Sequence, residues 1–191
     1  MDGVLPPHIE RLRMVIFVAG VHGVGKTHLC QALARKSGLR HASASQLIRE
    51  VKRSETWKTD KIVTDIEGNQ DALSIAVDQI IQKEESLLLD GHFVLKKAFG
   101  VLEAIPPSTF ERLGLSAIVL IENEPALIAE RIYQRDSSTP TDNMEAFIKF
   151  ERNIALNISL KLEIPFFLMH GPSVDSFASC IESILELSSG K

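Results

Sequence analysis

The sequence is poor in cysteine, has no long apolar run and carries no excess of positive charge. Its two cysteines, Cys30 and Cys180, lie far apart, so we expect small buried side chains rather than a disulfide or a metal pair. No apolar run is long enough to cross a bilayer, and the first residues show no signal-peptide pattern, so we expect a cytoplasmic protein without a membrane span. A net charge of −4 argues against a broad nucleic-acid surface.

With 45% hydrophobic and 24% charged residues the chain can build a full core, and 191 residues suit a single domain over 1–191. Short apolar segments alternate with segments of helical periodicity, which predicts a parallel sheet with helices on both faces. The expected strands cover about 14–19, 39–43, 86–90, 115–121 and 165–169. The expected helices cover about 26–37, 45–53 with Ser45 as N-cap, 69–81, 108–112, 125–135, 144–161 and 177–185, with an irregular connection at 91–100.

The segment Gly20-Val-His-Gly-Val-Gly-Lys-Thr27 follows a strand-like run and precedes a helix-like one. It matches G-x-x-x-x-G-K-T in the strand–loop–helix setting that a P-loop requires. Glycines let the backbone approach a ligand, and bared N–H groups at a helix N-terminus attract phosphate oxygens. We therefore expect ATP with Mg²⁺, with Lys26 on the β- and γ-phosphates and Thr27 on the metal. The expected cofactor-binding residues are Gly20, His22, Gly23, Val24, Gly25, Lys26, Thr27 and His28.

Charged side chains occur where a phosphate site would need them. Asp90 ends a strand-like segment, so we expect it to lie beside the P-loop. There it can hold a Mg²⁺-bound water or accept a proton from the acceptor. The alternative is an aspartate that only stabilises a turn or caps a helix. Arg131 and Arg135 share a helix face before a polar loop, and Arg152 follows that loop. They can bring positive charge over phosphates on closure, with ordinary ion pairing as the alternative. The expected catalytic residues are Lys26, Asp90, Arg131, Arg135 and Arg152, and the expected metal ligands are Thr27 and Asp90.

Arg49 is the candidate for binding the phosphate of an acceptor. It follows the second expected strand, and a guanidinium can fork onto a phosphate group. Lys52 and Arg53 are rival candidates, and an exposed helix arginine without a role is the alternative.

The histidines show no spacing typical of zinc. His22 and His92 both follow expected strands and can come together, so we expect a phosphate or base contact. His92 joins Arg49 as an expected substrate-binding residue. His41 is expected to pack in the core or on the surface, which is also the alternative for His28.

With these residues in place, the chain resembles the archaeal-type adenylate kinases and other small adenylate-kinase-like P-loop proteins. The resemblance runs from Met14 to Met169 and rests on the P-loop, Thr59–Gln70, Leu87–Phe93, Ile118–Glu122 and Glu130-Arg131. It implies an α/β P-loop NTPase fold of three α/β/α layers, similar to nucleoside monophosphate kinases, with a five-stranded parallel sheet ordered 2-3-1-4-5. It also implies an acceptor-binding insert at about 44–70 and a short lid at about 136–143.

Three functions remain open at this point. The favoured one is transfer of the γ-phosphoryl group of ATP to a small-molecule phosphate acceptor, a nucleoside monophosphate, as the resemblance implies. A phosphate acceptor is already ionised, so positioning and charge neutralisation suffice. The second is a kinase of a hydroxyl group, in which Asp90 acts as the base. The third is an ATP-binding switch or regulatory ATPase that acts on a partner. The sequence predicts neither the acceptor nor the oligomeric state.

Overall fold

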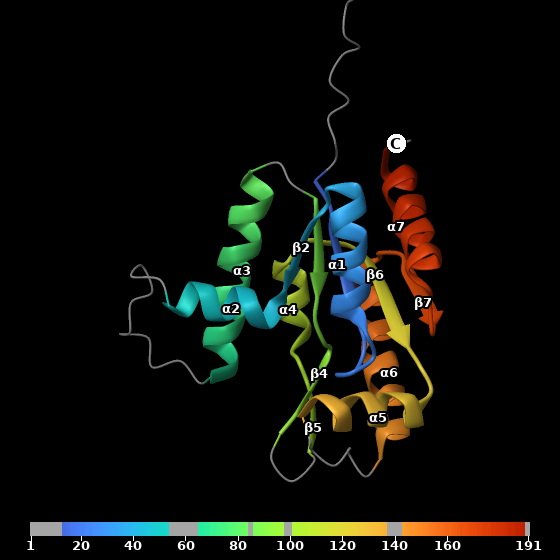
Figure 1. The fold of residues 1–191 in the computed structure, drawn as a ribbon. Coiled ribbons are helices and arrows are strands. Elements are labelled where there is room, and N and C mark those ends of the chain that lie inside the picture. Colours follow the sequence, from blue (N-terminus) through green and yellow to red (C-terminus); the bar gives the residue numbers. More distant parts are fainter. Residues whose placement is uncertain (1–12, 54–64, 84–85, 98–100, 137–142, 190–191) are drawn as a thin grey trace, which may run out of the picture.

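A five-stranded parallel sheet forms the centre of the computed structural model, which describes residues 13–53, 65–83, 86–97, 101–136 and 143–189 (Figure 1). The sheet order is β2-β3-β1-β6-β7, and β4 pairs with β5 in a separate antiparallel hairpin. Counting only the strands of the main sheet, this order is 2-3-1-4-5, which confirms the expected fold class. The strands are β1 (Val15–Ala19), β2 (Arg40–Ser43), β3 (Leu87–Asp90), β4 (Val94–Lys96), β5 (Leu102–Ala104), β6 (Leu115–Glu122) and β7 (Phe166–His170).

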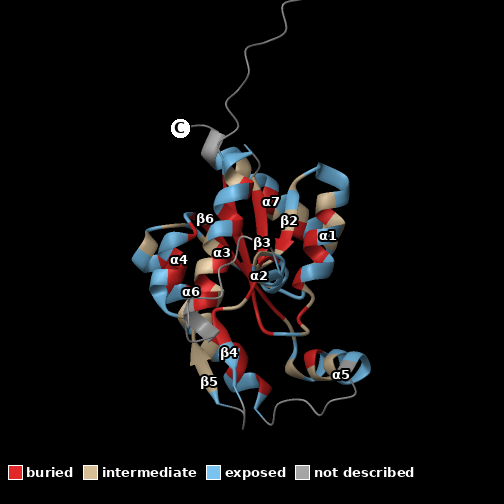
Figure 2. Ribbon diagram, turned by 90° about the vertical axis from the view of Figure 1, so that its left-hand side faces the viewer, coloured by how far each residue is buried: buried red, intermediate tan, exposed pale blue. Residues whose placement is uncertain are grey.

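Helices cover both faces of the sheet and give three layers. Helices α1 and α7 lie on one face, and α3, α4 and α6 lie on the other (Figures 1 and 2). Helix α5 lies across the end of the sheet at which the parallel strands finish (Figure 1). The helices are α1 (Lys26–Ser37), α2 (Ala44–Arg53), α3 (Asp65–Gln82), α4 (Pro107–Arg112), α5 (Pro125–Asp136), α6 (Met144–Leu162) and α7 (Val174–Ser189).

The central strands are continuous apolar runs because helices cover them on both sides. Every residue of β1 and β3 is buried, as the red strands in Figure 2 show. Phe17 of β1 packs edge-on against Phe93 and Phe110, with ring centroids 5.0 and 5.5 Å away. This aromatic cluster joins β1, the segment after β3 and α4 beneath the end of the sheet that carries the P-loop.

Local sequence signals set the ends of several elements. Helix α1 ends at Gly38, whose φ of 72° is left-handed and whose N–H donates to Ala34 O. Helix α6 begins after Asn143, whose side chain accepts a hydrogen bond from Ala146 N, as an N-cap should.

Three sequence-based boundaries were wrong. Helix α2 already begins at Ala44, so Ser45 lies inside the helix. Helix α3 begins at Asp65 instead of near Asn69, because packing against α2 and α4 extends it through a glycine that discourages helix locally. The connection at 91–100 contains β4, which is too short to show an alternating pattern.

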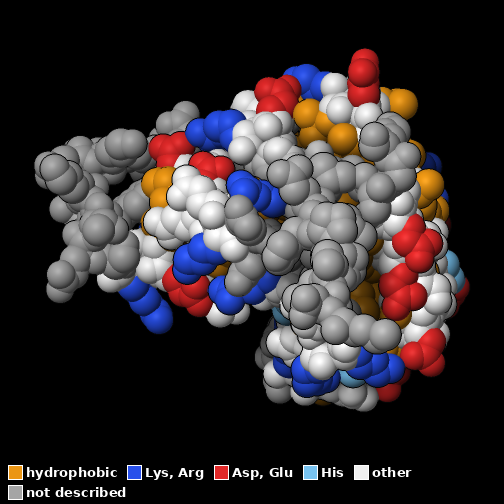
Figure 3. Space-filling view, turned by 90° about the horizontal axis from the view of Figure 1, so that it is seen from above, with side chains coloured by type: hydrophobic (Ala, Val, Ile, Leu, Met, Phe, Trp, Pro, Cys, Tyr) orange, Lys and Arg blue, Asp and Glu red, His pale blue; other side chains and the backbone are white. Residues whose placement is uncertain are grey.

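Both cysteines are free, Cys30 buried and Cys180 half-buried, which agrees with their expected role as small packing side chains. Among the described helices, none combines the length and apolar character needed to span a membrane. On the face where the parallel strands begin, basic and acidic side chains are both visible (Figure 3).

Candidate active site

The site lies where β1 and β3 finish side by side. Val18 of β1 pairs in register with Asp90 of β3, and Gly91 N donates to Val18 O at 3.1 Å. The chain then continues from β1 into the P-loop and from β3 toward His92. The carboxyl ends of neighbouring parallel strands are the usual place for ligands in such sheets. The predicted position of Asp90 beside the P-loop is therefore confirmed.

The P-loop is held in a conformation that favours glycine. Gly20, Gly23 and Gly25 have φ of 141°, 83° and 111°, a region that other residues rarely adopt. A Cβ on Gly23 would lie 2.7 Å from Ile132 Cγ1, so the loop fits closely against α5. The ammonium of Lys26 donates to Gly20 O at 2.6 Å and to Val21 O at 3.2 Å. These contacts hold the lysine head group inside the curve of the loop.

Lys26 is buried among groups of opposite charge. Burial lowers its pKa from 10.5 to about 8, and the negative charges of Glu151 and Asp90 oppose that shift. Glu151 of α6 accepts hydrogen bonds from Phe93 N at 2.9 Å and Val94 N at 2.8 Å. Burial raises the pKa of Glu151 to about 7, against the effect of those bonds and of Lys26. Sequence reasoning missed Glu151, which no local motif distinguishes from an ordinary helix glutamate.

A central cavity of about 270 Å³ opens over the P-loop and gathers most of the residues expected from the sequence. Arg131 and Arg135 reach it from α5: Arg131 Nη1 donates to Val24 O at 3.0 Å, and Arg135 contacts the His22 ring. Three cationic side chains therefore surround one small space, which is what a triphosphate requires. The cavity is lined by His22, Gly23, Gly25, Lys26, Thr27, His28, Ser43, Ser45, Asp90, His92, Arg131 and Arg135.

Two of the predicted arginines lie elsewhere. Arg152 forks onto the carboxylate of Glu122, with Nε donating to Oε1 at 2.6 Å, and this bond raises the pKa of Arg152. Arg49 is exposed on α2. Neither lines the cavities described here, so their proposed roles in catalysis and acceptor binding stay predictions.

The histidines differ from one another in their surroundings. His41 is largely buried, which agrees with the expected packing, and its Nε2 also lies 2.7 Å from Asp90 Oδ2, a contact that was not expected from the sequence. His22 and His92 do come together, with ring centroids 6.2 Å apart. His92 Nδ1 donates to Gly20 O at 2.8 Å, and burial, assisted by the charge of Lys26, lowers its pKa well below 6.5. His92 is therefore a neutral ring beside the P-loop.

The side chains that line the central cavity suit Mg²⁺ better than a metal ion whose ligands all come from the protein. Within the described residues, no group of three or more His, Cys, Asp or Glu side chains could hold a metal ion. Mg²⁺ usually takes one or two protein ligands together with substrate phosphates and water. Thr27 and Asp90 both line the cavity, and their assignment as metal ligands stays a prediction.

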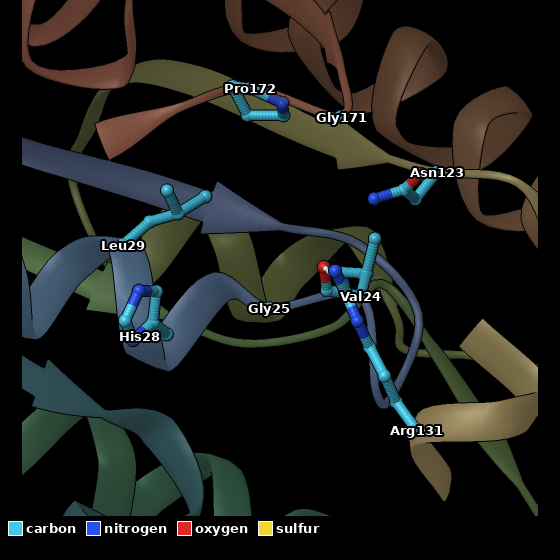
Figure 4. A pocket seen from close by; sticks show the side chains of 8 residues that line it. All are labelled: Val24, Gly25, His28, Leu29, Asn123, Arg131, Gly171 and Pro172. Atoms are coloured by element: carbon cyan, nitrogen blue, oxygen red, sulfur yellow. Dashed lines mark hydrogen bonds between the residues drawn. The ribbon is translucent and has the colours of Figure 1, made fainter. Parts of the chain in front are cut away.

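A second cavity of about 380 Å³ adjoins the first, beside α1 (Figure 4). Val24, Gly25, His28 and Leu29 form one wall, and Asn123, Gly171 and Pro172 form the other, with Arg131 at its mouth. It shares Gly25, His28 and Arg131 with the central cavity. Asn123, Gly171 and Pro172 escaped sequence reasoning because they follow β6 and β7 without a recognisable motif.

A third cavity of about 240 Å³ lies on the opposite side, between α2, α3 and α4. Its walls are mainly apolar and include Phe17, Ile48, Leu73, Phe110 and Leu113. It shares Ser43, Ser45, Asp90 and His92 with the central cavity, so the three cavities lie next to one another with the central one in the middle.

Two residues that line the third cavity each carry a buried polar atom that lacks a partner in the described structure and has almost no surface open to the cavity. These are Gln70 Nε2 and Thr109 Oγ1, on residues only 8% and 3% exposed. Leaving a buried donor unpaired costs about 1–3 kcal/mol, so such atoms call for an explanation.

The predicted domain features are only partly described. The acceptor-binding insert at 44–70 begins with α2 and ends within α3, but 54–64 lie outside the described residues. The same holds for 137–142 of the expected lid. Both assignments stay predictions.

The comparisons with known proteins agree with this architecture. A family model described as an AAA domain matches residues 19–148. A protein named adenylate kinase from Thermoplasma volcanium is 32% identical over 116 residues, which cover 60% of this chain and 64% of that protein. Another adenylate kinase, from Thermoplasma acidophilum, is 27% identical over 116 residues, covering 60% and 63%. The match thus spans less than two thirds of these relatives' length.

Solved structures with other names share the fold. A gluconokinase from Sinorhizobium meliloti 1021 superposes with a TM-score of 0.54 at 14% identity, covering 94% of this chain and 95% of that one. Shikimate kinase from Acinetobacter baumannii gives a TM-score of 0.56 at 16% identity, with 95% and 97% covered. At these identities the likeness shows the fold alone. Because the family model covers more than half of the chain and carries its P-loop, this chain belongs to the AAA domain family, in an adenylate-kinase-like P-loop fold.

Proposed function

We propose that this protein is an ATP-dependent kinase that transfers the γ-phosphoryl group of ATP to a nucleoside monophosphate. The observation that carries the proposal is the row of three adjoining cavities with the P-loop at its centre. One end suits the base of the donor, the middle suits phosphates, and the other end suits an acceptor. A site for hydrolysis alone would not need the third cavity.

On the donor side, the triphosphate lies on the P-loop amides with Lys26 at the β- and γ-phosphates. Arg131 and Arg135 neutralise the charge that spreads over the transferred group, because they reach the same cavity from α5. The base of ATP occupies the cavity between His28 and Pro172. Thr27 and Asp90 would hold Mg²⁺ on the protein side, and the bound ion would neutralise phosphate charge.

On the acceptor side, the phosphate of the acceptor lies near Ser43 and His92, which the central and third cavities share. Among the described residues that line the third cavity, Asp90 is the only one with a carboxylate, and this carboxylate is already hydrogen-bonded to His41. A phosphate acceptor needs no base, so this arrangement favours a nucleoside monophosphate. Arg49 of α2 remains the candidate for a guanidinium on the acceptor phosphate.

One observation favours a hydroxyl acceptor instead. The pair of His41 and Asp90 can receive a proton, as transfer to an alcohol would require. The similar structures named gluconokinase and shikimate kinase share this fold. We keep a kinase of small alcohols as the second candidate function.

The test is a transfer assay with radiolabelled γ-phosphate. The protein is incubated with ATP, Mg²⁺ and, separately, each nucleoside monophosphate, each nucleoside, gluconate and shikimate. The proposal predicts labelled nucleoside diphosphate with at least one monophosphate and little free phosphate without an acceptor. Label on a nucleoside or sugar alone would support the second candidate. Free phosphate that does not depend on any acceptor would contradict both.

A further inference from the structure

We propose that Glu151 of α6 is a positioning residue that holds His92 against the P-loop, through the backbone that follows His92. The consequence for catalysis rests on the proposed function, in which His92 lies near the phosphate of the acceptor. The positioning itself rests on the geometry of the described residues and is testable without turnover.

The carboxylate of Glu151 is buried and uses both of its oxygens. Oε1 accepts a hydrogen bond from Phe93 N at 2.9 Å, and Oε2 accepts one from Val94 N at 2.8 Å. Glu151 is only 1% exposed and is not among the residues that line the three cavities. Its effect on a bound ligand is therefore indirect and passes through the groups that it contacts.

The two N–H groups explain why this buried side chain is a carboxylate. Each N–H has a separate oxygen as its acceptor, whereas the amide of a glutamine would offer only one oxygen. Burying a charge is costly unless the charge is paired and hydrogen-bonded. Burial raises the pKa of Glu151, and the backbone bonds together with the nearby ammonium of Lys26 oppose that rise. The site thus contains a buried charge whose two hydrogen bonds a neutral side chain could not replace.

His92 lies between two fixed points of the chain. Before it, Gly91 N donates to a carbonyl oxygen at the end of β1 at 3.1 Å. After it, Phe93 is held on both sides, because its N–H donates to Glu151 and its carbonyl oxygen accepts from Ile105 N at 2.8 Å. The backbone of His92 cannot shift without disturbing one of these bonds.

The ring of His92 is joined to the P-loop at an oxygen that it shares with Lys26. His92 Nδ1 donates to Gly20 O at 2.8 Å, and Lys26 Nζ donates to the same oxygen at 2.6 Å. The backbone of Gly20 also hydrogen-bonds the carboxylate of Glu151. Glu151, His92 and the first residue of the P-loop are therefore one connected group, assembled from three distant segments of the chain.

Loss of the Glu151 bonds should displace the ring of His92 and leave the triphosphate site in place. Misplacing a group by about 1 Å can lower a rate by about 10²-fold. The residues that cradle the triphosphate do not include Glu151, so ATP should still bind. The alternative is that Glu151 only satisfies two buried N–H groups and supports the fold.

The experiment compares Glu151→Gln and Glu151→Asp with wild type. Glutamine keeps the size of the side chain but loses one acceptor oxygen, and aspartate keeps the charge but is one methylene shorter. The matched control is Glu145→Gln, the same chemical change at an exposed position of the same helix. Heteronuclear NMR of the unliganded proteins follows the Nδ1–H signal of His92, and melting temperatures show whether each variant folds.

For both Glu151 variants we expect the Nδ1–H proton of His92 to exchange with water about tenfold faster or more, because its bond to Gly20 opens. The kcat/KM for the acceptor should fall by about 10- to 100-fold. Calorimetry should still give one ATP per chain with undiminished affinity. The melting temperature should fall by roughly 2–8 °C, since one N–H loses its acceptor. Glu145→Gln should match wild type.

A double-mutant cycle with His92→Phe shows whether Glu151 acts through His92. Phenylalanine keeps a ring and removes the hydrogen bond to Gly20. In that background Glu151→Gln should lower activity by less than about threefold further, because the effects of coupled residues do not add. A residue that only supports the fold would lower activity by the same factor in both backgrounds.

The inference is overturned if the His92 signal of Glu151→Gln matches that of wild type, or if the two losses in the cycle multiply. Full activity of Glu151→Asp would also overturn it, since the charge would then matter and the two bonds would not. Failure of the proposed function looks different. Wild type would then phosphorylate no nucleoside monophosphate, while the His92 signal would still depend on Glu151, which supports the inference.

Discussion

The proposed donor and acceptor sides of the site are built in opposite ways. The donor side is polar and local: one stretch of chain, Gly20–His28, provides most of the phosphate cradle, and its cations are Lys26, Arg131 and Arg135. The acceptor side is apolar and dispersed. Its lining comes from β1, α2, α3, the hairpin and α4, which no single motif contains.

This difference has a chemical meaning. A triphosphate carries dense charge, so a few amides and cations in a fixed loop recognise it in any protein of this kind. An acceptor is distinguished by its uncharged part, which only shape and a few placed hydrogen bonds can recognise. The side that defines the reaction is therefore short in sequence, and the side that defines the substrate is assembled by the fold.

The largest expected effect comes from Lys26→Ala on the donor side. It removes the buried ammonium inside the P-loop and should lower kcat/KM by about 10³-fold or more, because no other group occupies that position. Lys36→Ala on the exposed part of the same helix is the control. Steady-state kinetics and ATP titrations measure both, and equal activity of the two variants would contradict the assigned site.

Asp90→Asn tests a residue that lines both the central and the third cavity. It keeps the shape but removes a negative charge beside Lys26 and His41, and should lower kcat by about 10²-fold with a weaker Mg²⁺ dependence. His41→Gln, which leaves the carboxylate in place, should have the smaller effect if the acceptor is a phosphate. Equal losses in the two variants would favour a hydroxyl acceptor that uses the pair as a base.

The pH dependence of ATP affinity tests whether the charge of Lys26 contributes to ATP binding. The pKa of Lys26 is lowered to about 8, and a bound triphosphate must raise it by stabilising the ammonium. Binding therefore takes up a proton above pH 8, and affinity should fall there by up to about tenfold per pH unit. Below pH 8 the lysine is already charged and affinity should level off. Calorimetry at a series of pH values measures this, and a flat profile up to pH 10 would contradict it.

The last comparison concerns stability rather than activity. Gly20→Ala introduces a Cβ against the carbonyl oxygen of Ile121, and should lower the free energy of unfolding by roughly 2–4 kcal/mol. Gly114→Ala also has a positive φ but has nothing within 4 Å of the new Cβ, and should lose only about 1–2 kcal/mol. Urea unfolding compares the two variants. Equal losses would show that the P-loop does not pack closely against β6.

The fold was largely predictable from the sequence because its strands are buried on both faces and separated by periodic helices. The P-loop, Asp90 and the two arginines of α5 were predictable because each is placed by its own strand or helix. Glu151 was not, since its importance depends on contacts with residues far along the chain. The role of His41 was missed for the same reason: β2 and β3 are neighbours only in the folded sheet.

The claim that donor and acceptor occupy one site can be tested by the affinity of a dinucleoside pentaphosphate, in which five phosphates join adenosine to the nucleoside of the best acceptor found in the transfer assay. Calorimetry with wild-type protein and Mg²⁺ should give one molecule bound per chain, about 10²-fold or more tighter than ATP, because the second half binds at high effective concentration. An affinity equal to that of ATP, with the second nucleoside contributing nothing, would contradict the account.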